Sequence, residues 1–299
     1  MLSFTKTGGR KIARVKDGKH DKKFIYLSDT NDDNKFLSKD FFKKHKKMKK
    51  KDILKLKQSI KDGREPLDEN LKDIFKDAMD DIKNSSRNEI RITDGVLIPL
   101  PNKKIVEKIY VSAPSGAGKS TWCGKWLSEF KKIFKKDEIF VFSTIQNDKV
   151  LDRHNPIGVD LEALFEDPVE PDETRDSVCV FDDVDTIQDL DIRNIVCSYR
   201  DFLLEQGRHF NTRLLITSHL LMDYKATRRI LNEATTIVFF PKCGSTHHIK
   251  VYLQKYAGLD NTQIKRILKL PSRWVALYKS YPMYILYDKG VYLLSNDDE

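Results

Sequence analysis

The feature that most constrains this chain is a glycine-rich loop, APSGAGKS, at residues 113–120. An apolar run at residues 109–111 precedes the loop, and a helix-forming run at residues 121–130 follows it. This strand–loop–helix context is typical of a loop that holds nucleotide phosphates, although alanine stands where the pattern has its first glycine. The residues expected to contact a nucleotide are Ala113, Pro114, Ser115, Gly116, Ala117, Gly118, Lys119, Ser120 and Thr121.

The residue types of this loop suit phosphate chemistry. Gly116 and Gly118 let the backbone curl, so that its N–H groups and the positive end of the following helix face phosphate oxygens. Lys119 is expected to bridge the β- and γ-phosphates, and the Ser120 hydroxyl is expected to bind Mg²⁺. The loop therefore predicts ATP and Mg²⁺ as cofactors. The alternative is a glycine-rich turn before an ordinary helix.

Two adjacent carboxylates follow another apolar run, VCVF at residues 178–181. Because the carboxyl ends of parallel strands face the ligand crevice, Asp182 and Asp183 are expected beside the phosphate loop. Asp182 is placed to bind Mg²⁺ and Asp183 to orient the attacking water, a role for which Asp185 competes. Asp183 stands where a longer glutamate is more usual. Without the loop, capping aspartates in a strand-end turn would be the better interpretation.

The apolar runs from residue 108 onward alternate between strand and helix patterns, which predicts an α/β fold with a central, mostly parallel sheet. One expected strand, residues 138–143, lies between the loop and the acidic strand, an order that favours a RecA-like P-loop NTPase over a small-molecule kinase. Another strand, residues 214–217, leads into Ser218 and His219, and we expect His219 to sense the γ-phosphate. A polar loop after a core strand is the alternative.

An arginine near a subunit edge can reach the γ-phosphate of a neighbouring subunit. Arg208 precedes the strand that leads to His219 and is the candidate for this catalytic role. Any such arginine can instead be a solvated surface charge. The rival candidates are Arg153, Arg200, Arg228 and Arg229.

The sequence divides into a basic N-terminal appendage, residues 1–88, and an ATPase core, residues 89–299. The appendage is expected to be small and α+β, with a hairpin that turns at Asp17 and Gly18. A second hairpin is expected to turn at Asp94 and Gly95. The core is expected to contain a helix that starts at residue 223 or 224 and to end in a β-hairpin.

Charge is concentrated in the appendage. The formal net charge of +9 permits a polyanionic partner without requiring one. Residues 41–61 hold ten lysines and one aspartate, and apolar residues at helical spacing predict a helix with one basic face. This segment is expected to grip a DNA backbone; a solvated charge run or a capsid-docking arm is the alternative.

Other features bear on the compartment. The four cysteines show no CxxC spacing and are expected to be free thiols in a reducing environment. The N-terminal residues lack an apolar signal-peptide core, so the protein is expected not to be secreted. No apolar run approaches the ~20 residues that a spanning helix needs, and no membrane partner is expected.

Four segments carry a family resemblance: APSGAGKST, VCVFDDVD, GRHFNTRLLITSHL and RILNEATTIVFF, at residues 113–121, 178–185, 207–220 and 229–240. Together they resemble the FtsK–HerA superfamily, and more narrowly the genome-packaging ATPases of nucleocytoplasmic large DNA viruses, including the poxvirus type. The segment at 270–294, LPSRWVALYKSYPMYILYDKGVYLL, also fits this viral branch. The resemblance covers about residues 90–294.

This resemblance implies a homo-oligomeric ring that translocates double-stranded DNA into a preformed capsid. Capsid proteins are then further partners, and the expected location is a viral factory in the host cytoplasm or the virion. His219 replaces the glutamine that is common in related enzymes. The alternative function is a nucleotide kinase or another P-loop phosphotransferase, although no acceptor pocket or arginine-rich lid is legible. A guanine-binding switch and a two-lobed helicase fit the sequence less well.

Overall fold

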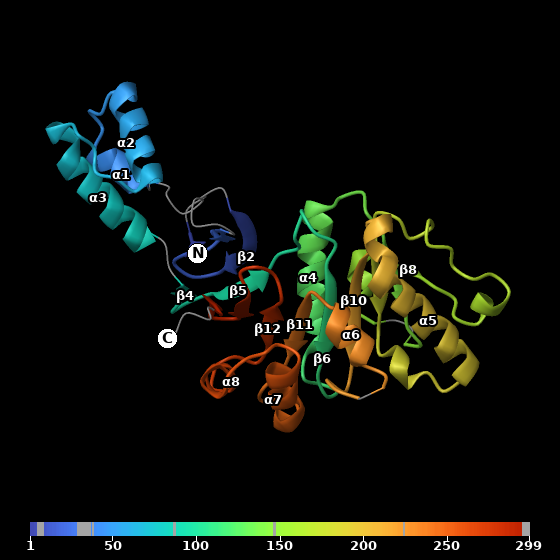
Figure 1. Cartoon of the computed structure of the whole chain (residues 1–299). Helices are drawn as coiled ribbons and strands as arrows, with labels where there is room; N and C mark the ends of the chain where they lie inside the picture. The colour runs from blue at the N-terminus through green and yellow to red at the C-terminus, as the bar shows by residue number, and fades with distance from the viewer. Residues whose placement is uncertain are drawn as a thin grey trace. The chain divides into compact units, whose positions relative to one another are not determined.

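The computed structural model (Figure 1) describes residues 1–4, 9–28, 37, 39–85, 88–145, 148–223 and 225–294. The chain forms two compact units. The first comprises Met1–Val96 with Gly290–Leu293, and the second comprises Leu97–Lys289 and Leu294. The second unit carries the phosphate loop and both acidic residues. The division of function between an appendage at 1–88 and a core at 89–299 stays a prediction.

The second unit is an α/β fold built on one large sheet. Its strand order is β13-β12-β11-β6-β10-β9-β7-β8. The strands from β11 to β8 run parallel, whereas β12 and β13 are antiparallel additions. The strands are β6 (Lys108–Ser112), β7 (Ile139–Phe142), β8 (Ile157–Gly158), β9 (Val178–Phe181), β10 (Arg213–Ser218), β11 (Thr236–Phe239), β12 (Val275–Tyr278) and β13 (Tyr284–Tyr287).

The core strands are buried on both faces. Every residue of β9, β10 and β11 is buried, which explains their continuous apolar runs rather than an alternating pattern. The rings of Phe142 and Phe181 stack at 4.6 Å between centroids. The helices that accompany this sheet in Figure 1 are α4 (Lys119–Ile133), α5 (Leu190–Gln206), α6 (Arg228–Glu233), α7 (Thr246–Lys255) and α8 (Asn261–Leu268).

The order of the parallel strands identifies the fold. β10 lies between the phosphate-loop strand β6 and the acidic strand β9, and β7 follows β9. This is the arrangement of a RecA-like P-loop NTPase with a mostly parallel sheet, as the sequence predicts. The expected antiparallel C-terminal strands are also present, with β12 paired to β13 over Val275 to Tyr278.

The first unit combines short strands and helices. Its strands are β1 (Leu2–Ser3), β2 (Arg10–Lys16), β3 (Phe24–Leu27), β4 (Glu89–Arg91) and β14 (Gly290–Leu293), and its helices are α1 (Lys39–Lys44), α2 (Lys50–Asp62) and α3 (Glu69–Ser85). The hairpin of β2 and β3 is confirmed, because the two strands pair antiparallel and both Asp17 and Gly18 have positive φ. A small apolar cluster of Phe41, Leu56, Ile60 and Ala78 joins the helices.

The prediction of a hairpin that turns at Asp94 and Gly95 is wrong. β4 pairs antiparallel with β14, and β5 (Val96–Pro99) belongs to a different sheet. The turn instead packs against the first hairpin: the backbone N–H of Lys19 donates to Asp94 Oδ2 at 2.9 Å. A turn signal in the sequence fixes a local bend, but here long-range pairing decides which strands become neighbours.

The prediction of a single lysine-rich helix at residues 41–61 is also wrong. α1 ends at Lys44 and α2 begins at Lys50, with a turn between them. His45 Nε2 and Lys44 Nζ both contact Asp77 Oδ2 of α3, at 3.1 and 2.7 Å. These contacts hold the chain where the helix breaks.

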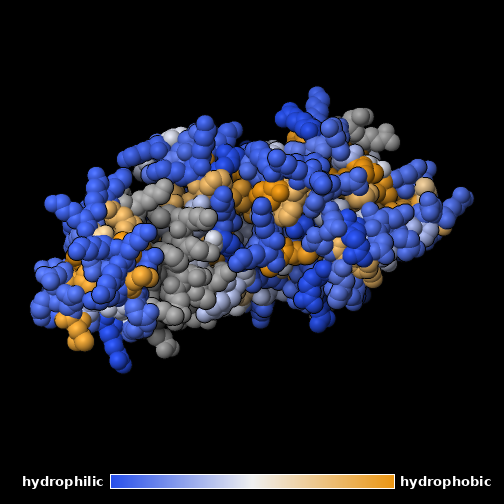
Figure 2. Space-filling model, turned by 90° about the horizontal axis from the view of Figure 1, so that it is seen from above, coloured by the Kyte–Doolittle hydropathy of each residue, from blue (hydrophilic) through white to orange (hydrophobic). Residues whose placement is uncertain are grey.

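Other helix expectations were partly met. Tyr224, a possible start of one expected helix, lies outside the described residues, and α6 begins at Arg228. α5 begins at Leu190 and is capped by the Asp189 side chain, which accepts from two backbone N–H groups. None of the helices in the described part of the chain is long and apolar enough to span a membrane. Figure 2 shows a face that is mainly hydrophilic, as expected for a chain with 33% charged residues.

Candidate nucleotide-binding site

The predicted site residues meet at the carboxyl edge of the parallel sheet. The phosphate loop leaves β6 after Ser112, and Asp182 follows β9 directly. Between them β10 ends at Ser218, which pairs in register with Ser112. The N–H of Ala113 donates to the Ser218 carbonyl at 3.1 Å, so the loop begins anchored to the neighbouring strand. The phosphate loop, the acidic strand end and the end of β10, which are far apart in the sequence, therefore lie side by side.

The loop has the backbone that phosphate binding requires. Gly116 and Gly118 have φ values of 72° and 113°, in the region that side chains disfavour. α4 then begins at Lys119, so its free N–H groups and the positive end of its dipole lie at the loop. Ala113, which replaces the usual first glycine, is buried and does not have positive φ. The missing glycine is thus compatible with the loop geometry.

Lys119, Asp183 and His219 form a closed triangle of polar contacts. Lys119 Nζ lies 3.1 Å from Asp183 Oδ1 and 3.0 Å from His219 Nδ1. His219 Nε2 lies 3.2 Å from Asp183 Oδ2. A neutral imidazole with its proton on Nε2 satisfies both of its contacts, since it accepts from the lysine and donates to the carboxylate. The three predicted catalytic residues of the chain's own site are therefore in direct contact.

Asp182 is the most buried carboxylate of the site, at 7% exposure. Burial raises the pKa of its carboxyl, a hydrogen bond from Thr217 lowers it, and the adjacent Asp183 charge raises it. The Thr217 hydroxyl lies 2.8 Å from Asp182 Oδ1, and the Ser143 hydroxyl lies 3.5 Å from Oδ2. A buried carboxylate whose ionised form is disfavoured is one that a bound cation would stabilise.

The oxygen donors here fit Mg²⁺. Mg²⁺ is usually held by one or two carboxylates together with substrate phosphates and water, so a large protein cage is not needed. Asp182 and the Ser120 hydroxyl at the start of α4 supply hard oxygen ligands of this kind. No group of three or more His, Cys, Asp or Glu side chains that could hold a metal occurs among the described residues.

Thr217 joins the two aspartates. Its hydroxyl accepts from the Asp183 backbone N–H at 2.9 Å and lies within donating distance of both carboxylates. Asp183 has φ 45° and ψ 37°, a left-handed conformation that Asp and Asn adopt more readily than other non-glycine residues. This backbone requirement gives a reason for a short acidic residue where a glutamate is more usual.

Arg208 does not join this cluster. It lies in the turn η5 (Gly207–Phe210), which precedes β10, whereas His219 follows the same strand. β10 therefore separates Arg208 from its own chain's phosphate loop, and the side chain is exposed. Among its rivals, Arg200 and Arg229 both contact Asp201. A role for Arg208 at a neighbouring subunit stays a prediction.

Three residues near the site were not assigned roles from the sequence. Thr217 and Ser143 could have been found, since both are hydroxyl residues at the carboxyl ends of the two strands that flank the acidic strand β9. Arg273 carried no signal of its own. Its Nη2 donates to the Gly116 carbonyl at 3.3 Å, a contact between residues far apart in the sequence.

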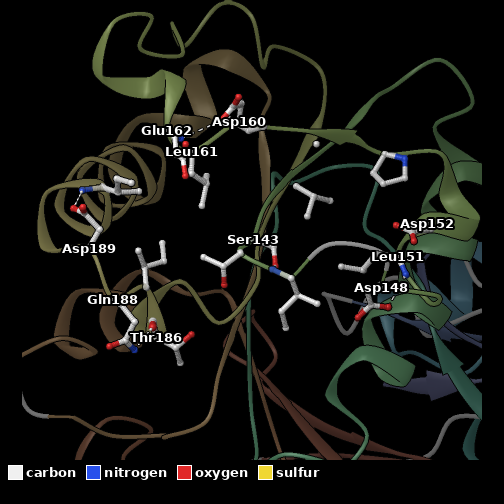
Figure 3. A pocket seen from close by; sticks show the side chains of 18 of the residues that line it. Ser143, Asp148, Leu151, Asp152, Asp160, Leu161, Glu162, Thr186, Gln188 and Asp189 are labelled. Atoms are coloured by element: carbon white, nitrogen blue, oxygen red, sulfur yellow. Dashed lines mark hydrogen bonds between the residues drawn. The ribbon is translucent and has the colours of Figure 1, made fainter.

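A cavity of about 1150 Å³ opens beside this edge of the sheet, from the end of β7 to the start of α5 (Figure 3). Ser143, which contacts Asp182, is one of its lining residues. Three of its acidic side chains stabilise local turns: Asp148, Asp160 and Asp189 each accept from two backbone N–H groups. These carboxylates therefore have structural partners already.

No protein-family model matches the chain. Over 209 residues, the chain is 37% identical to uncharacterized protein V3 of Sputnik virophage, which covers 69% of this chain and 85% of that protein. The chain belongs to the family of this virophage protein. Its strand order, with the phosphate-loop strand β6 next to β10 and the acidic strand β9 beyond, is that of a RecA-like P-loop NTPase fold.

Solved structures with similar folds include two viral proteins. The genome-packaging NTPase B204 of Sulfolobus turreted icosahedral virus 2, in complex with AMPPCP, is 13% identical, covers 60% of this chain and 96% of that chain, and has a TM-score of 0.42. The DNA-packaging ATPase B204 of Sulfolobus Turreted Icosahedral Virus is 14% identical, with a coverage of 61% and 97% and a TM-score of 0.42.

A third similar structure is the cytoplasmic domain of the Thermomonospora curvata type VII secretion ATPase EccC. It is 13% identical, covers 71% of this chain and 29% of that chain, and has a TM-score of 0.44. With TM-scores below 0.5, the fold assignment rests on the strand order and the loop geometry of this chain.

Proposed function

We propose that this protein is an ATP-driven motor that translocates double-stranded DNA into a viral capsid. The observation that carries the ATPase part is the contact of Lys119 with Asp183 and His219 beside a loop shaped for phosphate. The DNA-packaging part is supported by the resemblance of the sequence motifs and by the virophage origin of the relative.

In the nucleotide-binding step, the backbone N–H groups of the loop hold the phosphates of ATP. Lys119 leaves Asp183 Oδ1, now 3.1 Å away, and turns its ammonium group to the β- and γ-phosphates. This exchange replaces one anionic partner of the lysine with another. It also frees an oxygen of Asp183, which can then accept a hydrogen bond from the attacking water once the nucleotide is bound.

In the hydrolysis step, Asp183 accepts a hydrogen bond from the attacking water. The water oxygen bonds to the γ-phosphorus, the bond from that phosphorus to the β–γ bridging oxygen breaks, and the water proton passes to Asp183 or to a phosphate oxygen. His219 Nε2, now 3.2 Å from Asp183 Oδ2, keeps this carboxylate oriented toward the attacking water. Mg²⁺, held by Ser120 and Asp182, would supply positive charge to the phosphate oxygens.

The proposed assembly is a homo-oligomeric ring around double-stranded DNA, with Arg208 of one subunit acting on the nucleotide of the next. Capsid proteins would be its docking partners, and a viral factory in the host cytoplasm or the virion would be its location. The exposed position of Arg208 beyond the opposite end of β10 supports a role outside its own site.

The Lys119→Ala variant tests the ATPase assignment. We expect ATP turnover to be abolished, because the ammonium group neutralises charge that grows on the β–γ bridge. Phosphate release in the presence of Mg²⁺ is the measurement. Turnover within about threefold of wild type would exclude this loop as the active site.

Because Lys119 is also the partner of a nearly buried carboxylate, Lys119→Ala needs a folding control. Circular dichroism and thermal melting of the nucleotide-free protein supply it. Ser120→Ala is the companion variant: it keeps the Lys119–Asp183 contact and removes only the hydroxyl proposed to bind Mg²⁺. Loss of turnover in both variants, with a normal spectrum, supports the assignment.

A nucleotide kinase remains the second candidate function, since the same loop chemistry would serve it. A kinase requires an acceptor next to the γ-phosphate, and the cavity beside Ser143 is the space available for one. Phosphate transfer to a small acceptor, with indifference to DNA, would favour this function over the motor.

A further inference from the structure

Arg273 lies against the phosphate loop although it comes from the far end of the chain. It belongs to the connection between α8 and β12, and it is exposed, whereas Ser272 and Trp274 on either side are buried at 4% and 9% exposure. The Ser272 hydroxyl donates to the Trp274 carbonyl at 2.6 Å. The Trp274 ring packs edge-on against Trp122 of α4, with 6.1 Å between centroids. The backbone that carries Arg273 is thus fixed to the helix that follows the loop.

The guanidinium group lies alongside both loop glycines. Arg273 Nη2 donates to the Gly116 carbonyl at 3.3 Å. A Cβ built on Gly118 would lie 3.9 Å from Arg273 Nε and 4.0 Å from Cζ, which is ordinary van der Waals contact. The arginine therefore lies next to the two residues whose backbone forms the cradle for phosphate.

The hydrogen-bonding capacity of this arginine is largely unused. A guanidinium has five N–H donors, and a carbonyl at 3.3 Å takes up one of them. The described residues give Arg273 no carboxylate partner, whereas Lys119 of the same site is paired with Asp183. An unpaired guanidinium beside an anion-binding loop matches the fork geometry that binds phosphate oxygens.

The side from which Arg273 approaches indicates which phosphates it can serve. It arrives from the β12 side of the sheet, next to β11, whereas Asp183 and His219 follow β9 and β10. β6 and its loop lie between these two groups of strands. Arg273 is therefore on the opposite side of the loop from the residues assigned to the γ-phosphate and the attacking water.

We propose that Arg273 binds the part of the nucleotide that ATP and ADP share, the α- and β-phosphates, from the same chain as the loop. The inference rests on the proposed nucleotide site. Binding that is the same in the ground state and the transition state lowers KM without changing kcat. Arg273 would thus set nucleotide affinity, whereas Lys119 and Asp183 set the rate.

The test compares Arg273→Gln and Arg273→Lys, with nucleotide affinity measured by titration calorimetry for ATP-γ-S and ADP. We expect Arg273→Gln to lower the binding affinity for both nucleotides about tenfold or more, because a hydrogen bond to a charged group is lost. The kcat of this variant should stay within about twofold of wild type. Arg273→Lys should recover part of the affinity because it keeps the charge. Lys265→Gln on α8 is the control, since it removes one exposed charge without a contact to the loop.

Each other outcome has a meaning. Unchanged affinity for both nucleotides in Arg273→Gln overturns the inference. A fall in kcat with unchanged affinity also overturns it. If the wild-type protein binds no nucleotide, the proposed function fails; if the wild type binds and hydrolyses ATP while Arg273→Gln matches it, only this inference fails.

Discussion

At the scale of residues, the division of labour between the two aspartates is the point most open to test. Asp182 is more buried and accepts from Thr217, whereas Asp183 contacts both Lys119 and His219. The first is suited to holding a cation in place and the second to the water that attacks phosphorus. Two adjacent aspartates would then have different chemical roles, because their surroundings differ.

Asp183→Asn should separate nucleotide binding from hydrolysis. The amide is nearly isosteric, and Asn tolerates the left-handed backbone found at this position, so the fold should survive. It cannot polarise water as a carboxylate does, and turnover should fall by roughly 10²-fold or more while nucleotide affinity persists. Titration with ATP-γ-S and a phosphate-release assay give the two quantities. Asp182→Asn should instead weaken Mg²⁺-dependent binding, and identical behaviour of the two variants would contradict this division.

Much of the site was predictable at this scale. The phosphate loop, the acidic pair and His219 could be read from the sequence, because each follows an apolar strand whose carboxyl end must face the same edge of a parallel sheet. The position of Arg273 could not be predicted, because no local sequence pattern shows that the connection before β12 packs against the phosphate loop. Nor could the left-handed backbone of Asp183, which depends on the Thr217 hydroxyl of another strand.

At the scale of elements, the lysine-rich region gains a specific geometry. Lys46, Lys47 and Lys49 are exposed in the turn between α1 and α2, and Lys50 and Lys51 open α2. Cations at a helix N-terminus oppose the helix dipole. α2 also begins without a side-chain cap, because Lys49 makes no capping hydrogen bond. A bound phosphate would neutralise the lysine charges at the start of α2 and would accept hydrogen bonds from its uncapped N–H groups. This supports the predicted contact of the turn with a nucleic-acid backbone.

Replacing these five lysines with glutamine should weaken DNA binding and flatten the dependence of log affinity on log salt by several units, since each neutralised phosphate releases counterion. Fluorescence anisotropy over a salt series measures the slope. The ATPase rate without DNA should not change. Lys55→Gln is a single-charge control, because Lys55 already contacts Asp68. An unaltered slope would assign the five lysines to another partner.

The same region shows why element boundaries resisted prediction. Apolar residues at helical spacing lie between residues 53 and 60, and the predicted helix extends over 41–61. The chain instead breaks into α1 and α2 where His45 and Lys44 contact Asp77 of α3. Likewise, the turn at Asp94 was found, but β4 pairs with β14 from the other end of the chain. Local propensity places turns and helices, whereas contacts between distant segments decide where they end and what they join.

At the scale of the whole molecule, a ring in which subunits share active sites makes a distinct prediction. Arg208→Ala and Lys119→Ala subunits should each be inactive alone, since an arginine acting in trans contributes about 10³–10⁵ in turnover. A mixture should recover activity, because some interfaces combine an intact Arg208 with an intact Lys119. ATPase rate against mixing ratio is the measurement. No recovery at any ratio, with oligomers confirmed by light scattering, would remove Arg208 from this role.

The central claim is that ATP hydrolysis at this loop drives movement on double-stranded DNA, and ATP turnover with and without DNA tests it most directly. We expect double-stranded DNA to stimulate wild-type turnover strongly, in a manner that high salt suppresses, and to leave Lys119→Ala inactive. A rate that is indifferent to DNA but rises with a small phosphate acceptor would contradict the motor and assign the protein to the phosphotransferases.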